Sequence, residues 1–348
     1  MGNGILLCYD NVYRLQTQII LSGVAETPDF FYNDFRKEVL YMSRIELIRE
    51  LKEIPASYRQ EAEKQGKLEK VEYTTADYED SSKLQHKYAL VYVPYGYDPA
   101  EKYDLVCLIH GGDGTPESYY DGDGKPTDLK NIFDHMIADG LMKPVLVLTP
   151  TFCPEDRSEL KKMEFPVKIG YLDRYTAQFW KELTQEILPA VEGTYSTWAE
   201  GTDAGSLIKA RDHRLVSGFS MGSVTTWNIL THAAAYFRYY APMSGDYWGI
   251  ERAGGSSKTE ETVKLMRDEI AGQGMKPEDY FIYAMTGSED IAYPNLSPMI
   301  EGMYSLHDPL FTPAEENGNL AWFVKKDGYH RYSDITEYVF NLLPRITF

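Results

Sequence analysis

The feature that most constrains the fold is an alternation, from Val71 onward, between short apolar segments and longer amphipathic ones. Continuous apolar strands separated by helices are typical of a mostly parallel sheet with helices on both faces. The expected strands are 88–93, 104–109, 145–148, 215–216, 239–241, 280–285 and 320–324, and the expected helices are 128–139, 174–192, 221–232, 258–271 and 331–343. The sequence therefore predicts an α/β domain over residues 71–348, with ligands bound at the carboxyl ends of its strands.

Residues 1–70 lack this alternation and predict a mostly helical N-terminal extension. The stretch from Ser43 to Glu46 has the form of a helix capping box, and apolar residues follow it at helical spacing as far as Leu51. Pro55 is expected to end that helix. We expect the extension to pack on the main domain or on a second subunit, which would form a homodimer through it.

Charge and cysteine content exclude several classes of protein. The 348 residues include 35 basic and 53 acidic ones, a formal net charge of −18, which disfavours binding to nucleic acids and to anionic membranes. Cys8, Cys107 and Cys153 form no Cys-x-x-Cys pair, which speaks against a disulfide framework or a structural zinc site, and we expect no metal or other cofactor. No apolar run is long enough to span a bilayer. Residues 1–23 lack the apolar block of a signal peptide, so we expect either a protein that stays inside the cell or one whose leader is missing.

A nucleophile-elbow motif follows the strand that begins at Leu215. Residues 218–222, Gly-Phe-Ser-Met-Gly, have the pattern G-x-S-x-G. The serine of this pattern sits in a tight turn between a strand and a helix, where the two glycines remove side chains that would collide. The N-terminus of the following helix directs free N–H groups at the reaction centre. We therefore expect Ser220 to be a nucleophile; the alternative is a turn of small residues without a chemical role.

A serine hydroxyl needs a base, and in folds with this elbow the carboxylate and then the histidine follow the serine along the chain. Among the histidines after Ser220, His330 stands in a polar loop between the last strand and the last helix, which is where the base is expected. His232 lies on the helix that follows the serine, and His307 lies in a loop with no strand before it. We expect His330 to be the base.

Two carboxylates, Glu289 and Asp290, follow the strand 280–285. Adjacent side chains cannot both point at one imidazole, and we expect Asp290 to be the acid and Glu289 to be solvated. The acid would hold the histidine tautomer and stabilise the imidazolium as it forms. Asp246, one strand earlier, is the alternative acid, because some hydrolases of this fold supply the carboxylate there.

The turn after the strand 104–109 is rich in glycine, with the sequence His-Gly-Gly-Asp-Gly over residues 110–114. An oxyanion in a tetrahedral intermediate needs preorganised donors, and we expect them to be the backbone N–H groups of Met221, Gly111 and Gly112. His110 is expected to brace this loop. The alternative is a phosphate-binding loop, but the Lys-Ser/Thr pair that such a loop needs is absent.

Together these segments resemble a known family. From about residue 88 to the C-terminus the chain is similar to the feruloyl esterase (cinnamoyl esterase) branch of carbohydrate esterase family one, which is related to esterase D and has the α/β-hydrolase fold. The likeness is greatest to the esterase modules of clostridial cellulosomal xylanases. The residues that carry it are 108–112, 148–152, 218–222 with 225–227, 242–248 and 286–293.

The resemblance implies a serine esterase that releases hydroxycinnamates such as ferulate from arabinoxylan, with Ser220, Asp290 and His330 as its triad. It also implies that Trp248 lines the pocket for the aromatic acyl group, and we expect His110 and Asp246 near the substrate. One alternative is an acetyl xylan esterase or general carboxylesterase of the same fold. Others are an acyltransferase and, from a different class, a non-catalytic carbohydrate-binding module.

Overall fold

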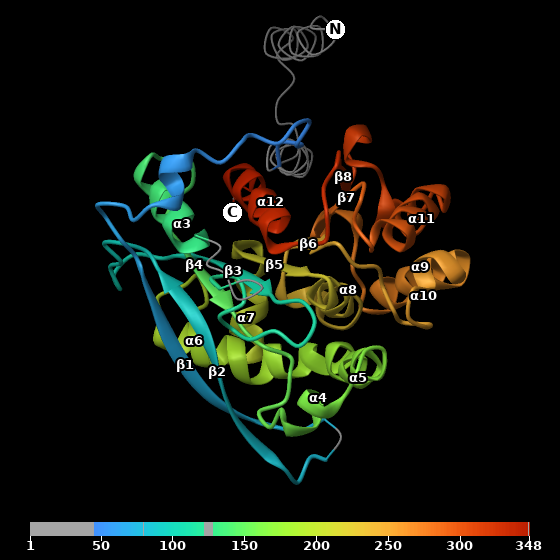
Figure 1. Ribbon diagram of the computed structural model, residues 1–348, viewed down its shortest axis with the longest axis horizontal. Coiled ribbons are helices and arrows are strands. Elements are labelled where there is room, and N and C mark those ends of the chain that lie inside the picture. The colour runs from blue at the N-terminus through green and yellow to red at the C-terminus, as the bar shows by residue number, and fades with distance from the viewer. Residues whose placement is uncertain (1–44, 79, 122–127, 347) are drawn as a thin grey trace, which may run out of the picture. The chain divides into compact units, whose positions relative to one another are not determined.

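The computed structural model describes residues 45–78, 80–121, 128–346 and 348, and its elements are labelled in Figure 1. The expected helical extension lies largely outside the described residues, because nothing before Ile45 is among them. Residues 45–348 form one compact unit. No helix in the described part of the chain is long and apolar enough to cross a membrane.

The strands of the described residues form one eight-stranded sheet in the order β1-β2-β4-β3-β5-β6-β7-β8. They are β1 (Lys67–Ala76), β2 (Leu84–Val93), β3 (Asp104–Ile109), β4 (Val145–Thr149), β5 (Arg214–Phe219), β6 (Tyr239–Met243), β7 (Phe281–Gly287) and β8 (Leu320–Lys325). Strands β3 to β8 are parallel to one another, whereas β2 pairs in antiparallel fashion with both β1 and β4. The expected mostly parallel sheet is confirmed, and every expected strand is formed.

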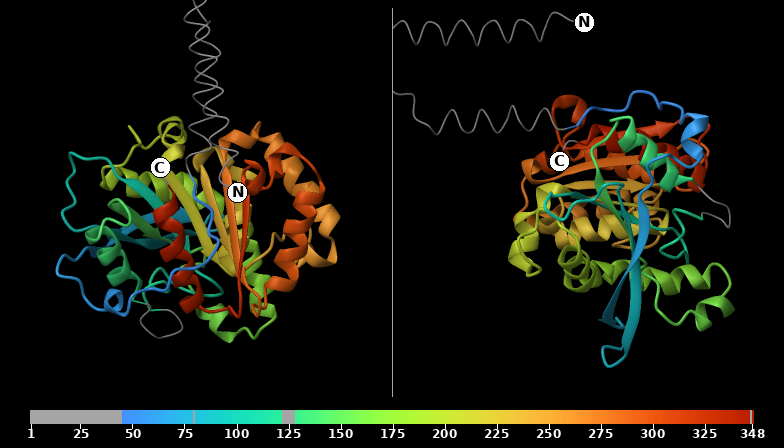
Figure 2. Two further views of the ribbon diagram at one scale, coloured as in Figure 1. Left: turned by 90° about the horizontal axis from the view of Figure 1, so that it is seen from above. Right: turned by 90° about the vertical axis from the view of Figure 1, so that its left-hand side faces the viewer.

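Helices cover both faces of this sheet, as Figure 2 shows. The longer ones are α3 (Leu129–Ala138), α5 (Val167–Glu182), α8 (Met221–Ala233), α10 (Thr259–Gly272), α11 (Tyr293–Ser305) and α12 (Tyr332–Leu342). The shorter ones are α4 (Ser158–Lys162), α6 (Leu188–Thr194), α7 (Ala204–Lys209) and α9 (Gly254–Ser257), with a π-helical turn, η3 (Leu183–Ile187), joining α5 to α6. The 3₁₀ turns are η1 (Ala56–Arg59), η4 (Arg211–His213), η5 (Ala234–Tyr236), η6 (Pro277–Asp279), η7 (Pro309–Phe311), η8 (Ala314–Glu316) and η9 (Leu343–Arg345).

Two hydrophobic cores lie on opposite faces of the sheet. Alternate residues of β3 belong to different cores: Leu105 and Cys107 pack with α5, α8 and α10, whereas Val106 and Leu108 pack with α3 and α12. All six residues of β3 are buried, as expected for a central strand covered on both faces. The two cores hold the sheet between its helices, so the loops at the carboxyl ends of the strands are anchored to packed strands and helices.

The segment from Ile45 to the start of β1, here named the strap, differs from the expectation. The helix expected there is wrong, because the strap has no helix before η1. Ile48 and Ile54, each 5% exposed, are instead buried in the core that contains α12. Asn341 of α12 accepts a hydrogen bond from the Lys52 N–H (2.7 Å) and donates one to the Lys52 carbonyl (3.0 Å). Asn341 thus pairs with both backbone groups of Lys52, and these tertiary contacts outweigh the local helix propensity.

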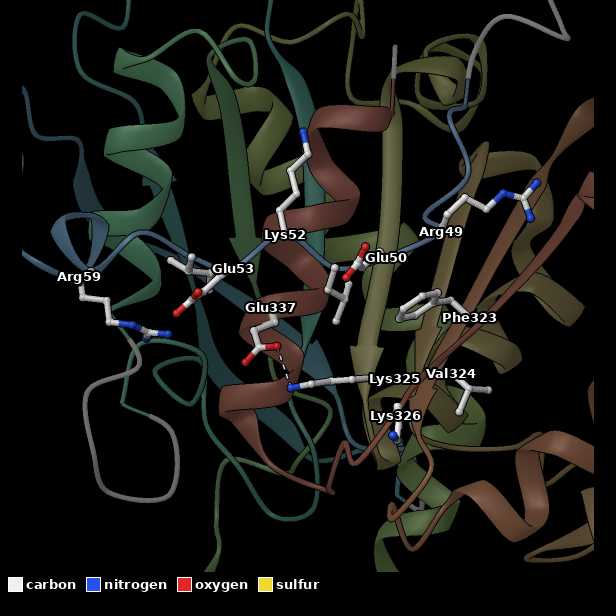
Figure 3. A pocket seen from close by; sticks show the side chains of 13 residues that line it. Arg49, Glu50, Lys52, Glu53, Arg59, Phe323, Val324, Lys325, Lys326 and Glu337 are labelled. Atoms are coloured by element: carbon white, nitrogen blue, oxygen red, sulfur yellow. Dashed lines mark ion pairs between the residues drawn. The ribbon is translucent and has the colours of Figure 1, made fainter. Parts of the chain in front are cut away.

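Figure 3 shows the strap crossing α12 beside a pocket of about 570 Å³. Charged side chains of both signs line this pocket, and Lys325 makes ion pairs with Asp334 and Glu337 at 2.7 Å each. The boundary expected after residue 70 falls inside β1, which the sequence analysis did not identify. The homodimer through the extension stays a prediction.

Candidate active site

Ser220 stands at the tip of the turn between β5 and α8. Its backbone has φ +57° and ψ −117°, in a region that residues with a side chain rarely adopt and that is common at functional sites. A Cβ on Gly218 would lie 2.1 Å from the Gly222 carbonyl oxygen, and one on Gly222 would lie 2.1 Å from the Ile109 carbonyl oxygen. Only glycine fits at either position, as the motif predicts.

His330 reaches Ser220 from the loop between β8 and α12. A backbone hydrogen bond from the Arg331 N–H to the Tyr329 carbonyl (3.0 Å) closes a three-residue turn and leaves His330 at its tip. Nε2 of the imidazole lies 2.9 Å from the Ser220 Oγ, and the Phe219 ring packs against the imidazole with 4.6 Å between ring centroids. The imidazole can therefore take the serine proton.

Asp290 completes the line from the loop after β7. Its Oδ1 lies 2.7 Å from Nδ1 of His330 and accepts the Ala292 N–H, also at 2.7 Å. Burial acts to raise the pKa of this carboxyl, but the hydrogen bond and charge of His330 outweigh burial, and the pKa lies below its ordinary value. Asp290 is 3% exposed, whereas Glu289 is exposed to solvent. Asp290 is thus ionised and in contact with the imidazole.

Asp246, the alternative acid, has other partners. Its carboxylate accepts the Trp248 indole N–H (2.8 Å) and the Gly255 N–H (3.0 Å). Burial raises the pKa of Asp246 above its ordinary value. These contacts give Asp246 the task of orienting Trp248, which is half-buried.

Two backbone amides close to Ser220 are suited to bind an oxyanion. The Met221 amide opens α8, so it has no acceptor within the helix. Gly112 has φ +53°, and its amide makes no hydrogen bond to another residue that the structure describes. The Gly111 amide, also expected to be a donor, is directed instead at the Tyr332 hydroxyl (3.2 Å). The tertiary contact with α12 therefore leaves Met221 and Gly112 as the available pair.

His110 supports the glycine loop from beneath. It is 1% exposed, and its Nε2 lies 2.7 Å from the Thr151 hydroxyl. Burial, assisted by the charge of Arg157, lowers the pKa of His110 to about 3, so its ring is neutral. The Arg157 guanidinium donates hydrogen bonds to the carbonyls of Asp113 and Gly114. His110 is therefore placed to brace the loop, and its burial is at odds with direct contact to a substrate.

The sequence analysis missed Tyr332, Phe219 and Arg157. Tyr332 stands two residues after His330, but no local pattern indicates that its hydroxyl reaches a glycine loop 221 residues away along the chain. The rejected histidines have other surroundings, because His232 stacks on Trp180 (centroids 5.7 Å apart) and His307 lies in a loop. Among the residues that the structure describes, no group of three or more histidine, cysteine or acidic side chains is placed to hold a metal ion.

A serine, an imidazole and a carboxylate in one hydrogen-bonded line, at the carboxyl ends of the strands of an α/β-hydrolase sheet, define a serine hydrolase. A protein-family model described as "Putative esterase" matches residues 81–297. The chain belongs to this esterase family, and its chemistry is that of a serine ester hydrolase.

Relatives of known identity support this assignment. The chain is 33% identical over 291 residues to endo-1,4-beta-xylanase Y of Acetivibrio thermocellus, covering 83% of this chain and 24% of that protein. It is 29% identical over 205 residues, 56% of this chain, to an endo-1,4-beta-xylanase/feruloyl esterase of Xylanibacter ruminicola, again covering 24% of that protein. The chain thus spans about a quarter of the length of these curated relatives.

Solved structures with a similar fold are also esterases. A mutant of the feruloyl esterase module from Clostridium thermocellum, complexed with sinapinate, is 31% identical with a TM-score of 0.70, covering 87% of this chain and 95% of that one. A carbohydrate esterase family one ferulic acid esterase from Anaeromyces mucronatus, in complex with ferulic acid, is 18% identical with a TM-score of 0.56, covering 84% of this chain and 95% of that one. The second likeness concerns the fold alone.

Proposed function

We propose that the chain is a feruloyl esterase that releases hydroxycinnamates from arabinoxylan through an acyl-enzyme on Ser220. The observation that carries the proposal is the line from the Ser220 Oγ to Nε2 of His330 (2.9 Å) and from Nδ1 of His330 to Asp290 (2.7 Å). The names of the relatives supply the substrate class, since they pair xylanases with feruloyl esterases.

Acylation begins when the Ser220 Oγ attacks the ester carbonyl carbon and its proton passes to Nε2 of His330. The carbonyl electron pair moves to oxygen, and the Met221 and Gly112 amides hold the resulting oxyanion. When the carbonyl re-forms, the bond to the alcohol oxygen breaks, and that oxygen takes the proton from Nε2 of His330. The products are the free sugar hydroxyl and a feruloyl ester of Ser220.

Deacylation repeats these steps with water. His330 removes a proton from water as the water oxygen attacks the acyl carbon, and the same proton returns to the Ser220 Oγ when the acyl bond breaks. Asp290 remains ionised throughout and stabilises the imidazolium that forms twice in each cycle. Over the two half-reactions, one ester and one water give one alcohol and one hydroxycinnamic acid, and Ser220 and His330 return to their starting states.

Trp248 is the residue we propose as a wall for the aromatic acyl group. The loop from Ser244 to Trp248 adjoins the elbow, because a Cβ on Gly245 would lie 2.5 Å from the Ser220 carbonyl oxygen. Asp246 fixes the indole through the 2.8 Å hydrogen bond from its N–H. Stacking of a planar acyl group on an indole contributes roughly 0.5–1.5 kcal/mol beyond burial, which favours a cinnamoyl group over an acetyl group.

The experiment compares kcat/KM on methyl ferulate and on naphthyl acetate for the wild-type protein and for Trp248→Ala. We expect the wild-type protein to prefer methyl ferulate and Trp248→Ala to lose most of that preference. A wild-type preference for the acetate would indicate an acetyl xylan esterase or general carboxylesterase. Ser220→Ala is expected to lose nearly all turnover; retention of more than about a tenth of the rate would remove Ser220 from its role.

Two further measurements address the remaining alternatives. Absence of an acyl-enzyme burst with every activated ester would favour a non-catalytic carbohydrate-binding module, against which the intact Ser–His–Asp line speaks. Faster transfer to an added sugar alcohol than to water would favour an acyltransferase.

A further inference from the structure

The loops that carry the acid and the base also expose apolar side chains to solvent. Ile291, next to Asp290, is 74% exposed, and Tyr329, next to His330, is 45% exposed. Single exposed apolar side chains are ordinary on a protein surface, so the interest of these two lies in their position next to the acid and the base. The mechanism proposed above uses neither residue.

These two loops are joined into one rigid rim. The Glu289 N–H donates to the Gly328 carbonyl (3.0 Å), and the Asp327 N–H donates to the Ser288 hydroxyl (2.9 Å). A Cβ on Gly287 would lie 2.1 Å from the Gly328 carbonyl oxygen, so the loops approach each other as closely as backbone permits. The backbone of this rim is therefore held at a fixed position relative to His330.

The turn centred on His330 brings its two neighbours together. The Arg331 guanidinium lies over the Tyr329 ring, with 4.4 Å between its carbon and the ring centroid. The Arg331 side chain is 57% exposed, and its Nε lies 3.4 Å from a carboxylate oxygen of Asp334. The guanidinium thus covers one face of the Tyr329 ring, and the opposite ring face and the outer N–H donors of Arg331 are left for a ligand, next to the general acid.

The chemistry of the reaction places the alcohol portion of the substrate on this side of the site. His330 protonates the leaving oxygen, so that oxygen must come within hydrogen-bond distance of Nε2. With the acyl group on the side of Trp248, as proposed above, the alcohol group would extend past the loop after β8. A sugar offers C–H groups that pack on an aromatic ring and hydroxyls that accept from a guanidinium.

We infer that Tyr329 and Arg331, with Ile291 at their edge, form a subsite for the sugar residue whose ester is cleaved. The inference rests on the proposed function and adds the recognition of the leaving group to it. The ligand is a neutral glycosyl group that stacks on the Tyr329 ring and accepts hydrogen bonds from Arg331. The subsite discriminates esters of sugars from esters of small alcohols that carry the same acyl group.

The experiment uses two substrates that differ only in their alcohol, namely feruloylated arabinoxylan oligosaccharide and methyl ferulate. The measured quantity is kcat/KM for the feruloylated oligosaccharide divided by kcat/KM for methyl ferulate, because kcat/KM includes the step in which the alcohol leaves. We expect the ratio to fall about five- to tenfold in Tyr329→Ala and to stay near the wild-type value in Tyr329→Phe, which keeps the ring. Since Tyr329 is largely at the surface, both variants are expected to fold.

Tyr95 supplies a matched control. It is 57% exposed, it has a lysine over its ring (Lys64, 5.9 Å), and it follows β2, which runs antiparallel to β4 and therefore ends at the amino ends of the parallel strands, away from Ser220. Tyr95→Ala is expected to keep the wild-type ratio.

The outcomes separate the two proposals. If the wild-type protein hydrolyses both esters and Tyr329→Ala leaves the ratio unchanged, or if it lowers both rates equally, the subsite is refuted and the proposed function stands. If the wild-type protein hydrolyses neither ferulate ester, the proposed function is refuted and the subsite with it.

Discussion

Replacing Asp290 by asparagine removes one charge from the site while preserving the shape of the side chain. In the wild-type protein a single oxygen, Oδ1, accepts both the His330 Nδ1–H and the Ala292 N–H. An asparagine with its oxygen at that position keeps both hydrogen bonds, and its amide group takes the place of Oδ2, which has no hydrogen-bond partner among the described residues. The imidazole therefore keeps its tautomer, with Nε2 free to take the serine proton.

What the variant loses is the attraction between the carboxylate and the imidazolium that forms in the transition state. For unit charges about 4 Å apart and an effective dielectric constant of about 20, this attraction is about 4 kcal/mol, or about 10³-fold in rate. A reversed tautomer costs more, about 10⁴-fold. We therefore expect kcat/KM of Asp290→Asn to fall about 10³-fold.

The assay is the initial rate of methyl ferulate hydrolysis, with thermal unfolding to establish that the variant folds. Glu289→Gln is the control, because it removes the neighbouring but exposed carboxylate and should change kcat/KM less than about twofold. A loss below tenfold in Asp290→Asn would show that Asp290 is not the acid. A loss of 10⁴-fold or more would show that the tautomer reverses and would refute the hydrogen-bond argument.

Three further predictions concern the turn at Ser220, the oxyanion loop and the titration of Glu186. Gly222→Ala places a Cβ 2.1 Å from a carbonyl oxygen of β3, and calorimetry should show that it lowers the stability by more than about 3 kcal/mol. The control Gly272→Ala lies in open space at the end of α10 and should change the stability by no more than about 1 kcal/mol; equal melting temperatures of the two variants would contradict this. Tyr332→Phe removes the acceptor of the Gly111 N–H and should lower kcat about fivefold, and an unchanged kcat would separate that contact from catalysis. Burial and the charge of a neighbouring carboxylate raise the pKa of Glu186 from 4.5 to about 7, so the native state binds more protons than the unfolded state between these values and its stability falls as the pH rises through them. Denaturant unfolding should show Glu186→Gln to be more stable than the wild-type protein at pH 8 and not at pH 5; the same difference at both pH values would refute the assignment.

Much of the fold and of the candidate site could be predicted because each depends on short-range patterns. A central strand such as β3 is buried on both faces and is therefore continuously apolar, which a sequence displays directly. The elbow needs glycine at two positions for steric reasons, and the order of Ser220, Asp290 and His330 follows the order of the strands that carry them. Local composition is sufficient for these inferences.

The remainder depends on contacts between distant segments. The strap has a good helix signal before η1, yet Asn341 and the core around α12 bind that part of it in a non-helical form. Strand β1 alternates between exposed and buried residues, which is a weaker signal than a continuous apolar run. The engagement of Gly111 by Tyr332 arises from packing of α12 against the glycine loop, and no pattern within either segment indicates it.

The strap also determines where this domain can be joined to another protein. Its backbone is held by α12, and its isoleucines occupy the core next to the last helix, so the first and last parts of the described chain close on each other. An engineer who fuses this catalyst to a xylan-binding partner should join the two upstream of Ile45. A cut at the start of β1 would remove Ile48 and Ile54 from the hydrophobic core.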